Sequence, residues 1–239
     1  MSETGNGPSR VDLLALQDKA KRDPEGYRDE FMQQQQHYQA LLGIFVLKPD
    51  AEHRGFGELV GFLAQLSGVY KPETEGLARE VIGLLDAHAA VLHPVLRRSL
   101  VQALILLRNR SRVETVRLLP LFFRLFRCHD KQLRQSIFGF IVYDIRNANK
   151  RRVDEKLNRS VQAFLHGALQ DEHEVAAKKS LAVLTELYRR NVWTGERPVN
   201  LVASAAFHKS PRVMVAALKF FLGHDEAADD EDDDDDDDD

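Results

Sequence analysis

One pattern of apolar or small residues recurs five times along the chain, at positions i, i+4, i+7 and i+8 of successive windows. The steps between the first residues of these windows are 37, 37, 43 and 37 residues. The windows are Leu59, Leu63, Leu66 and Ser67; Leu96, Leu100, Ala103 and Leu104; Leu133, Ile137, Phe140 and Ile141; Ala176, Ser180, Val183 and Leu184; and Val213, Ala217, Phe220 and Phe221. One such window predicts only an amphipathic helix. Five at nearly constant spacing are typical of HEAT or armadillo arrays, in which stacked helix pairs bury each other's apolar faces.

The remaining segments also favour helices, and no alternating strand-type segment of useful length is present. Three windows follow a helix-start signal, namely His93-Pro94, His129-Asp130 and Ser210-Pro211, each of which supplies proline or a capping side chain. The predicted helices span about 10–22, 24–47, 55–70, 74–86, 94–109, 114–127, 130–146, 155–169, 171–191, 198–208 and 211–222. We therefore expect an all-α, HEAT/armadillo-like α-solenoid of stacked helix pairs over residues 10–224. A disordered N-terminus (1–9) and a disordered acidic tail (225–239) should flank it.

Composition narrows the class of protein. With 239 residues and 44% apolar content, the chain can bury a substantial core. Its single cysteine, Cys128, excludes an internal disulfide and fits a reducing compartment. The polar residues 1–10 and the lack of an 18-residue apolar run argue against a secretory signal and a membrane span. These features predict a soluble intracellular protein.

The net charge of −4 averages two segments of opposite sign. Residues 225–239 contain 13 acidic and no basic residues, whereas residues 1–224 contain 33 basic and 24 acidic residues. Within 97–159 there are 16 basic and only 5 acidic residues. A basic body with an acidic tail points to polyanions or highly charged partners. The alternative is that long basic side chains only cover and solvate helix surfaces.

Ten basic residues are the candidates for contact with RNA or a protein partner. Arg97 and Arg134 each follow the first residue of a window by one position, so stacking should place both, exposed, on the same edge of adjacent repeats. A ladder of guanidinium groups suits phosphates, although salt bridges with Glu114, Asp154 and Glu155 are an alternative use. The full set is Arg97, Arg98, Arg108, Arg110, Arg112, Lys131, Arg134, Lys150, Arg151 and Arg152.

The acidic tail is a second candidate partner site. Its last eleven residues are all carboxylates and include Asp229, Asp230, Glu231, Asp232 and Asp239. It could compete with RNA for the basic surface, bind a basic protein, or act only as a solubilising segment.

The search for catalytic motifs is negative. The chain contains no GxxxxGK, GxGxxG, HExxH or GxSxG motif, and its nine histidines show no credible zinc spacing. His173 within the run 171–174 is more simply a cap at a helix start than a metal ligand. We expect no enzyme activity, no cofactor, no metal and no small-molecule substrate.

Several segments carry a resemblance to a known family. They are Lys21-Arg22-Asp23-Pro24 with Tyr27 and Phe31, residues 103–109, residues 125–131, residues 186–191 with Trp193, and residues 220–223 leading into the acidic run. From about residue 13 to 226 the chain resembles the N-terminal region of the severe-depolymerisation-of-actin family, eukaryotic nucleolar proteins of large ribosomal subunit assembly and export. The resemblance implies a HEAT-like scaffold in the nucleus or nucleolus, bound to pre-60S particles and without a catalytic centre. Family members continue for several hundred residues beyond the acidic stretch.

Two hypotheses follow from these observations. The first is a ribosome-assembly scaffold whose basic helical surface contacts pre-ribosomal RNA or assembly proteins. The second is a HEAT-type transport adaptor that recognises cargo or an export receptor through protein contacts, a hypothesis that rests on analogy of fold. Association that depends on RNA would favour the first, and association that survives ribonuclease would favour the second.

Overall fold

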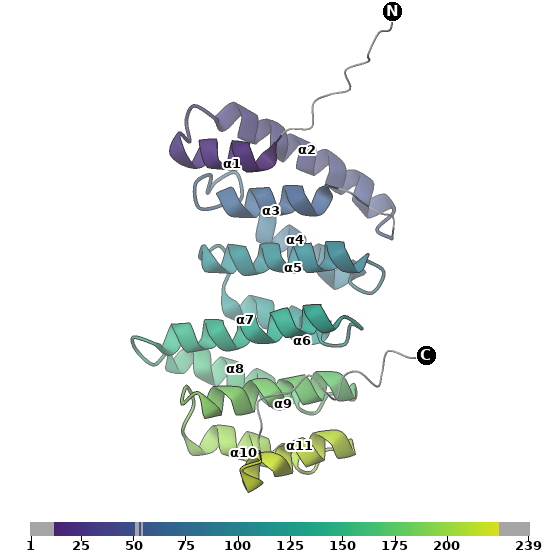
Figure 1. Ribbon diagram of the computed structural model, residues 1–239, viewed down its shortest axis with the longest axis vertical. Helices are drawn as coiled ribbons and strands as arrows, with labels where there is room; N and C mark the ends of the chain where they lie inside the picture. The colour runs from purple at the N-terminus through teal and green to yellow at the C-terminus, as the bar shows by residue number, and fades with distance from the viewer. Residues whose placement is uncertain (1–11, 51–52, 54, 225–239) are drawn as a thin grey trace, which may run out of the picture. The chain divides into compact units, whose positions relative to one another are not determined.

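The computed structural model describes residues 12–50, 53 and 55–224. Within these ranges it contains eleven α-helices and no β-strand, which confirms the predicted all-α class (Figure 1). The helices are α1 (Leu13–Arg22), α2 (Arg28–Leu47), α3 (Phe56–Leu66), α4 (Leu77–His88), α5 (Pro94–Asn109), α6 (Thr115–Leu125), α7 (Lys131–Asn149), α8 (Glu155–Ala168), α9 (Glu174–Arg189), α10 (Glu196–Ala205) and α11 (Pro211–Leu222). The predicted disorder of residues 1–9 and of the acidic tail 225–239 lies outside the described residues.

The chain forms two compact units that divide between Val113 and Glu114. In unit 1, which holds α1 to α5, α3 packs against α1, α2 and α5, while α4 packs against α5. In unit 2, which holds α6 to α11, α9 packs against α7, α8, α10 and α11, while α6 packs against α7 and α8. Each unit is therefore a stack of antiparallel helix pairs (Figure 1). The prediction that residues 10–224 form one continuous domain stays a prediction.

The five windows of the recurring sequence pattern fall on α3, α5, α7, α9 and α11, which we call the inner helices, and they mark residues that face the core. All sixteen residues of the first four windows, on α3, α5, α7 and α9, are buried. In the fifth window, on α11, Val213 and Ala217 are buried, but Phe220 is only half-buried and Phe221 is 47% exposed. The fifth window is therefore buried only in part. Among the described helices, α11 packs mainly against α9 and α10.

The helix-start signals supply proline or a capping side chain at all three positions, as predicted. Asp130 accepts a hydrogen bond from the backbone N–H of Leu133 at 2.9 Å, and the His93 ring accepts one from Val95 at 3.4 Å, with proline in the first turn of α5. At the third start, Pro211 stands in the first turn of α11, while the Ser210 hydroxyl donates to Glu174 of α9 and does not cap the helix. These contacts satisfy backbone donors that helix ends leave without an intrahelical partner.

Close packing in unit 1 requires a glycine at one position. A Cβ atom added to Gly57 of α3 would lie 3.0 Å from Cβ of Ser99 and 3.3 Å from Cδ1 of Leu96 on α5. A side chain at residue 57 would therefore require the side chains of Ser99 and Leu96 to shift by a few tenths of an ångström. In the described part of the chain, no helix is both long and apolar enough to cross a membrane.

We predict that Leu104→Asp destabilises the protein strongly, because Leu104 is 0% exposed and the carboxylate would have no partner at the centre of α5. The free energy of unfolding should fall by at least about 3 kcal/mol. The matched control is Val95→Asp on the same helix, where the side chain is 57% exposed and the same charge stays in water. Urea denaturation of both variants measures the effect, and equal losses would show that the window residues are not core.

Candidate binding surfaces

The structure places the two arginines of the predicted ladder inside the protein. Arg97 is 6% exposed and Arg134 is 8% exposed, so the expectation that both are exposed is wrong. Nη1 of Arg97 donates to the carbonyl of Ala89 at 2.8 Å, just after α4. Nη1 of Arg134 donates to the carbonyl of Cys128 at 2.9 Å, just after α6. The repeat register correctly predicted that Arg97 and Arg134 occupy equivalent positions. Both side chains, however, bind backbone carbonyls within the protein.

Helix geometry explains why both side chains point inward. At 100° per residue, the position after the first residue of a window lies about 20° from its i+8 position, which is buried. An arginine there runs along the edge of the buried stripe and reaches the end of the preceding helix. Carbonyls at a helix C-terminus lack intrahelical donors and carry partial negative charge, so a guanidinium stabilises them.

Most of the other candidates are also partly buried. Nη2 of Arg110 donates to Oε1 of Gln65 on α3 at 2.6 Å, and Nη2 of Arg112 donates to the carbonyl of Lys71 at 2.8 Å. These two arginines hold the segment after α5 against the end of α3 and the loop before α4. Arg98, Arg108 and Lys131 are half-buried. None of these five residues is fully exposed, and their contact with RNA or a protein partner stays a prediction.

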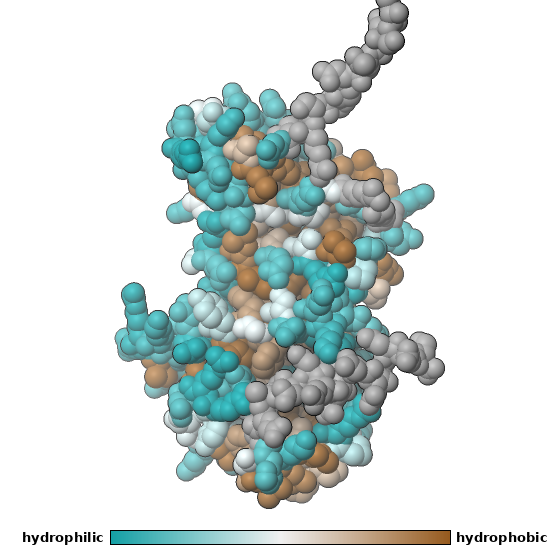
Figure 2. Space-filling view, in the orientation of Figure 1, coloured by the Kyte–Doolittle hydropathy of each residue, from teal (hydrophilic) through white to brown (hydrophobic). Residues whose placement is uncertain are grey.

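Three of the ten candidates are exposed, and they are consecutive. Lys150, Arg151 and Arg152 form the turn between α7 and α8 in unit 2. This turn projects at the left edge of the picture in Figure 1, and Figure 2 shows hydrophilic surface there. We call residues 150–152 the basic turn. It is the part of the predicted basic surface that the structure presents to solvent.

A network of amides fixes the ends of the basic turn. Nδ2 of Asn149 donates to Oδ1 of Asn158 at 2.9 Å, and Nδ2 of Asn158 donates back to Oδ1 of Asn149 at 2.8 Å. The backbone N–H of Asp154 also donates to Oδ1 of Asn149, at 3.0 Å. Nε1 of Trp193, which is 3% exposed, donates to Oδ1 of Asn158 at 3.0 Å. The turn is thus held at both ends and is tied to the segment that follows α9.

The end of α9 adds two further cations to this edge of unit 2. Arg189 and Arg190 are exposed, and both donate to the carboxylate of Glu186, which is 7% exposed. Burial alone would raise the pKa of Glu186, but the hydrogen bonds from Arg190 and Arg189 outweigh it and lower the pKa below 4.5. Glu186 therefore stays ionised and neutralises part of the charge of the two arginines.

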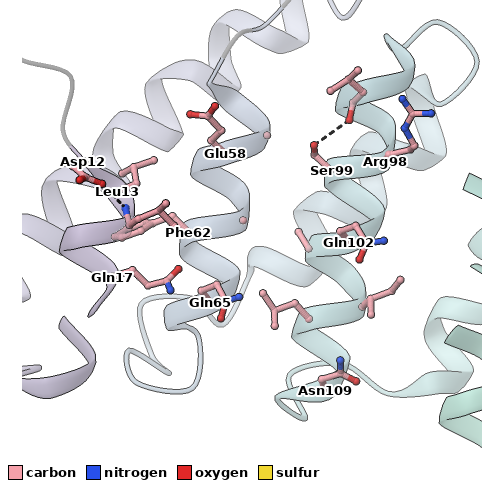
Figure 3. Close-up of a pocket in the computed structure, with 17 residues that line it drawn as sticks. Asp12, Leu13, Gln17, Glu58, Phe62, Gln65, Arg98, Ser99, Gln102 and Asn109 are labelled. Carbon is pink, nitrogen blue, oxygen red and sulfur yellow. Dashed lines mark hydrogen bonds between the residues drawn. The ribbon is translucent and has the colours of Figure 1, made fainter. Parts of the chain in front are cut away.

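A second surface feature, which sequence reasoning missed, is a groove in unit 1. It has a volume of 1110 Å³ and lies over α1, α3 and α5 (Figure 3). Its apolar lining includes Phe62, which points toward Leu13 in Figure 3, and glycines at positions 57 and 61. Four carboxamides line its walls: Gln17, Gln65, Gln102 and Asn109. Such groups can each donate and accept a hydrogen bond, which suits uncharged polar ligands such as peptide backbone.

Of the ten sequence candidates, Arg98 alone lines this groove. Gly61 leaves space in this groove, because a Cβ added there would meet no atom within 4 Å. Among the described residues, no group of three or more His, Cys, Asp or Glu side chains is arranged to hold a metal ion. Cys128 is half-buried and forms no disulfide in the described part of the chain.

Comparison with known proteins gives a consistent result over most of the chain. The family described as "SDA1, HEAT repeat" matches residues 62–239. The chain is 42% identical over 226 residues to the protein SDA1 homolog of Xenopus laevis, covering 95% of this chain and 33% of that protein. It is 43% identical to the SDA1 homolog of Drosophila melanogaster (95% and 32% covered) and 40% identical to that of Dictyostelium discoideum (92% and 29%). The chain thus spans about a third of the length of these curated relatives.

We predict that Arg134→Met lowers the free energy of unfolding by about 1–3 kcal/mol, since it keeps the apolar stem but removes the buried guanidinium that donates to the Cys128 carbonyl, which then keeps the backbone N–H of Asp130 as donor. The matched control is Arg152→Met, at an exposed position, which should change stability by no more than about 0.5 kcal/mol. Chemical denaturation of the two variants checks this. Identical stabilities would mean that the buried guanidinium contributes nothing.

The lowered pKa of Glu186 predicts a pH-dependent contribution to stability. Because the folded-state pKa lies below the ordinary value of 4.5, the contribution is complete above pH 4.5 and is lost as the pH falls through the folded-state pKa. The stability difference between wild type and Glu186→Gln should therefore be largest near pH 7 and should shrink toward about pH 3. Thermal melts across this range measure it, with the exposed Glu172→Gln as control. A difference that does not vary with pH would contradict the assignment.

Proposed function

The chain belongs to the SDA1 family, and on that premise we propose that it is a non-catalytic scaffold in the biogenesis and nuclear export of the 60S ribosomal subunit. In this proposal the protein resides in the nucleus and nucleolus and binds pre-60S particles through a basic helical surface. The resemblance of its sequence to nucleolar assembly proteins supports pre-60S particles as its binding partner. The exposed cations of unit 2 support the mode of binding.

The observation that carries the proposal is the basic turn. Three consecutive exposed cations (150–152) stand at an edge of unit 2 that Asn149 and Asn158 hold in place. Arg146, Arg189 and Arg190 are exposed at the ends of α7 and α9. Guanidinium groups bind phosphates with bidentate geometry. Ribosomal RNA offers such phosphates in abundance.

The arrangement of acids around the turn also supports an anionic partner. The carboxylate of Asp154 accepts the backbone N–H of Leu157 at 2.9 Å and so caps α8. The carboxylate of Asp144 accepts the hydroxyl of Thr115 and is buried. Both carboxylates keep their negative charge, but residues 144–156 contain five cations against three acids, so the net charge around the turn is positive.

A second candidate function is a transport adaptor that recognises a protein. The groove of unit 1 favours it, because its apolar lining and carboxamide walls match the backbone and side chains of a bound peptide better than they match phosphates. Ribonuclease separates the two candidates. Association with pre-60S particles that survives ribonuclease, in a protein that does not bind free RNA, would favour the adaptor.

We predict that neutralising the basic turn weakens RNA binding in a salt-dependent manner. Each lost phosphate contact lowers the slope of log affinity against log salt by about 0.7 for single strands, so Lys150→Ser, Arg151→Ser and Arg152→Ser together should lower it by about 2. The matched control replaces three exposed cations elsewhere in unit 2, namely Arg197, Lys209 and Lys219, with serine.

Fluorescence anisotropy with labelled RNA at several salt concentrations gives both slopes, and circular dichroism shows that each variant is folded. The salt slope of the control variant should lie closer to that of the wild type than the salt slope of the basic-turn variant does. If both variants lose the same slope, the contact is diffuse and the basic turn is not the site. If the wild type shows no salt-dependent RNA binding, the RNA-binding part of the proposal falls.

A further inference from the structure

An exposed aromatic side chain lies on the helix that leads into the basic turn. Tyr143 of α7 is 60% exposed. Arg146, Asn147 and Lys150 are also exposed, and they follow Tyr143 at spacings of three, four and seven residues. Residues at these spacings lie on one face of an α-helix. One face of α7 therefore presents an aromatic ring, an amide and two cations in a row that ends at the basic turn.

This face is distinct from the one that packs in the core. The buried face of α7 consists of Leu133, Arg134, Ile137, Phe140, Ile141, Val142, Asp144 and Ile145. Tyr143 is thus not required to fill the interior of unit 2, and a solvated face with polar side chains alone would serve the fold equally well. A single exposed aromatic residue is common on protein surfaces, but here it shares one face of α7 with the exposed cations Arg146 and Lys150.

The chemistry of the face matches an unpaired nucleotide. Stacking on an aromatic ring is available to every base, since each base has a π-face, and it requires that the base be unpaired. The amide of Asn147 can donate to and accept from a base edge. The cations on either side of the amide would contact the phosphates that flank such a base.

The dimensions of the helix agree with one strand that reaches both the ring and the turn. Seven residues of α-helix separate Tyr143 from Lys150, which corresponds to a rise of about 10 Å. About three stacked nucleotides, at about 3.4 Å each, cover this length. A strand whose base stacks on Tyr143 can therefore place its next phosphates at residues 150–152.

We propose that this face of α7 binds single-stranded RNA, with an unpaired base stacked on the ring of Tyr143 and adjacent phosphates held by Arg146, Lys150 and the rest of the basic turn. The inference rests on the proposed function, because it specifies the kind of RNA that the same surface recognises. Duplex RNA would contact the cations alone, since its bases are stacked within the helix and are not free to cover the ring.

The test compares Tyr143→Ala with Tyr143→Phe in the full chain. The probes are a labelled single-stranded RNA of about twelve nucleotides in mixed sequence and a duplex of the same length. Tyr143→Ala should weaken binding of the single strand about tenfold at constant salt, while the salt slope stays that of the wild type. Tyr143→Phe keeps the ring and should bind as the wild type does. Binding of the duplex should be the same for all three proteins.

The matched control is Phe207→Ala, which removes an aromatic side chain that is 89% exposed in unit 2, outside α7 and the basic turn. It should leave binding of both probes unchanged. Thermal midpoints of the variants should equal that of the wild type, because neither side chain is part of the core.

Two results would overturn the inference while leaving the proposed function in place. In the first, Tyr143→Ala binds the single strand as tightly as the wild type, although the basic-turn variant has lost affinity. In the second, Tyr143→Ala weakens single strand and duplex equally, or no more than Phe207→Ala does. A wild-type protein that binds neither probe, even at low salt, would overturn the inference together with the RNA-binding part of the proposed function.

Discussion

The stability of each helix pair depends on the burial of one narrow apolar stripe against its neighbours. The stripe occupies four positions in every 37 to 43 residues, and in α3, α5, α7 and α9 it is buried completely. A pair by itself could not remove this surface from water, so stacking is the condition of folding. The core also includes apolar residues of the other helices, such as Phe31 and Tyr38 of α2 and Phe122 of α6, whereas the turn between α7 and α8 carries exposed charge.

Cations serve two separate purposes in this protein, and their position relative to the stripe decides which. Arg97 and Arg134 border the stripe, lie buried, and bind the carbonyls at the end of the preceding helix. Arg151 and Arg152 lie in a turn, away from any stripe, and are exposed. The same guanidinium group thus stabilises a helix end in one place and is available to a partner in the other. Total charge does not distinguish these uses.

Sequence alone predicted the helices well because their signals are local and periodic. The bounds of α5 and α11 were predicted to the residue, since both begin at a proline and end where the apolar period ends. The binding surface was predicted less well. The exposure of Arg134 depends on the neighbouring helix end, and the pairing of Asn149 with Asn158 depends on the path of the turn. The groove of unit 1 was missed because it exists only once three helices pack together.

The two asparagines on either side of the basic turn constrain the number of residues between them but not the identity of those residues. Asn149 and Asn158 are nine residues apart and exchange two hydrogen bonds, so an inserted residue would separate the amides and release the indole N–H of Trp193 from its acceptor. Replacement of the residues between them leaves those bonds intact. Substitutions can therefore alter the charge of the turn without loss of these hydrogen bonds, whereas a change in its length would break them.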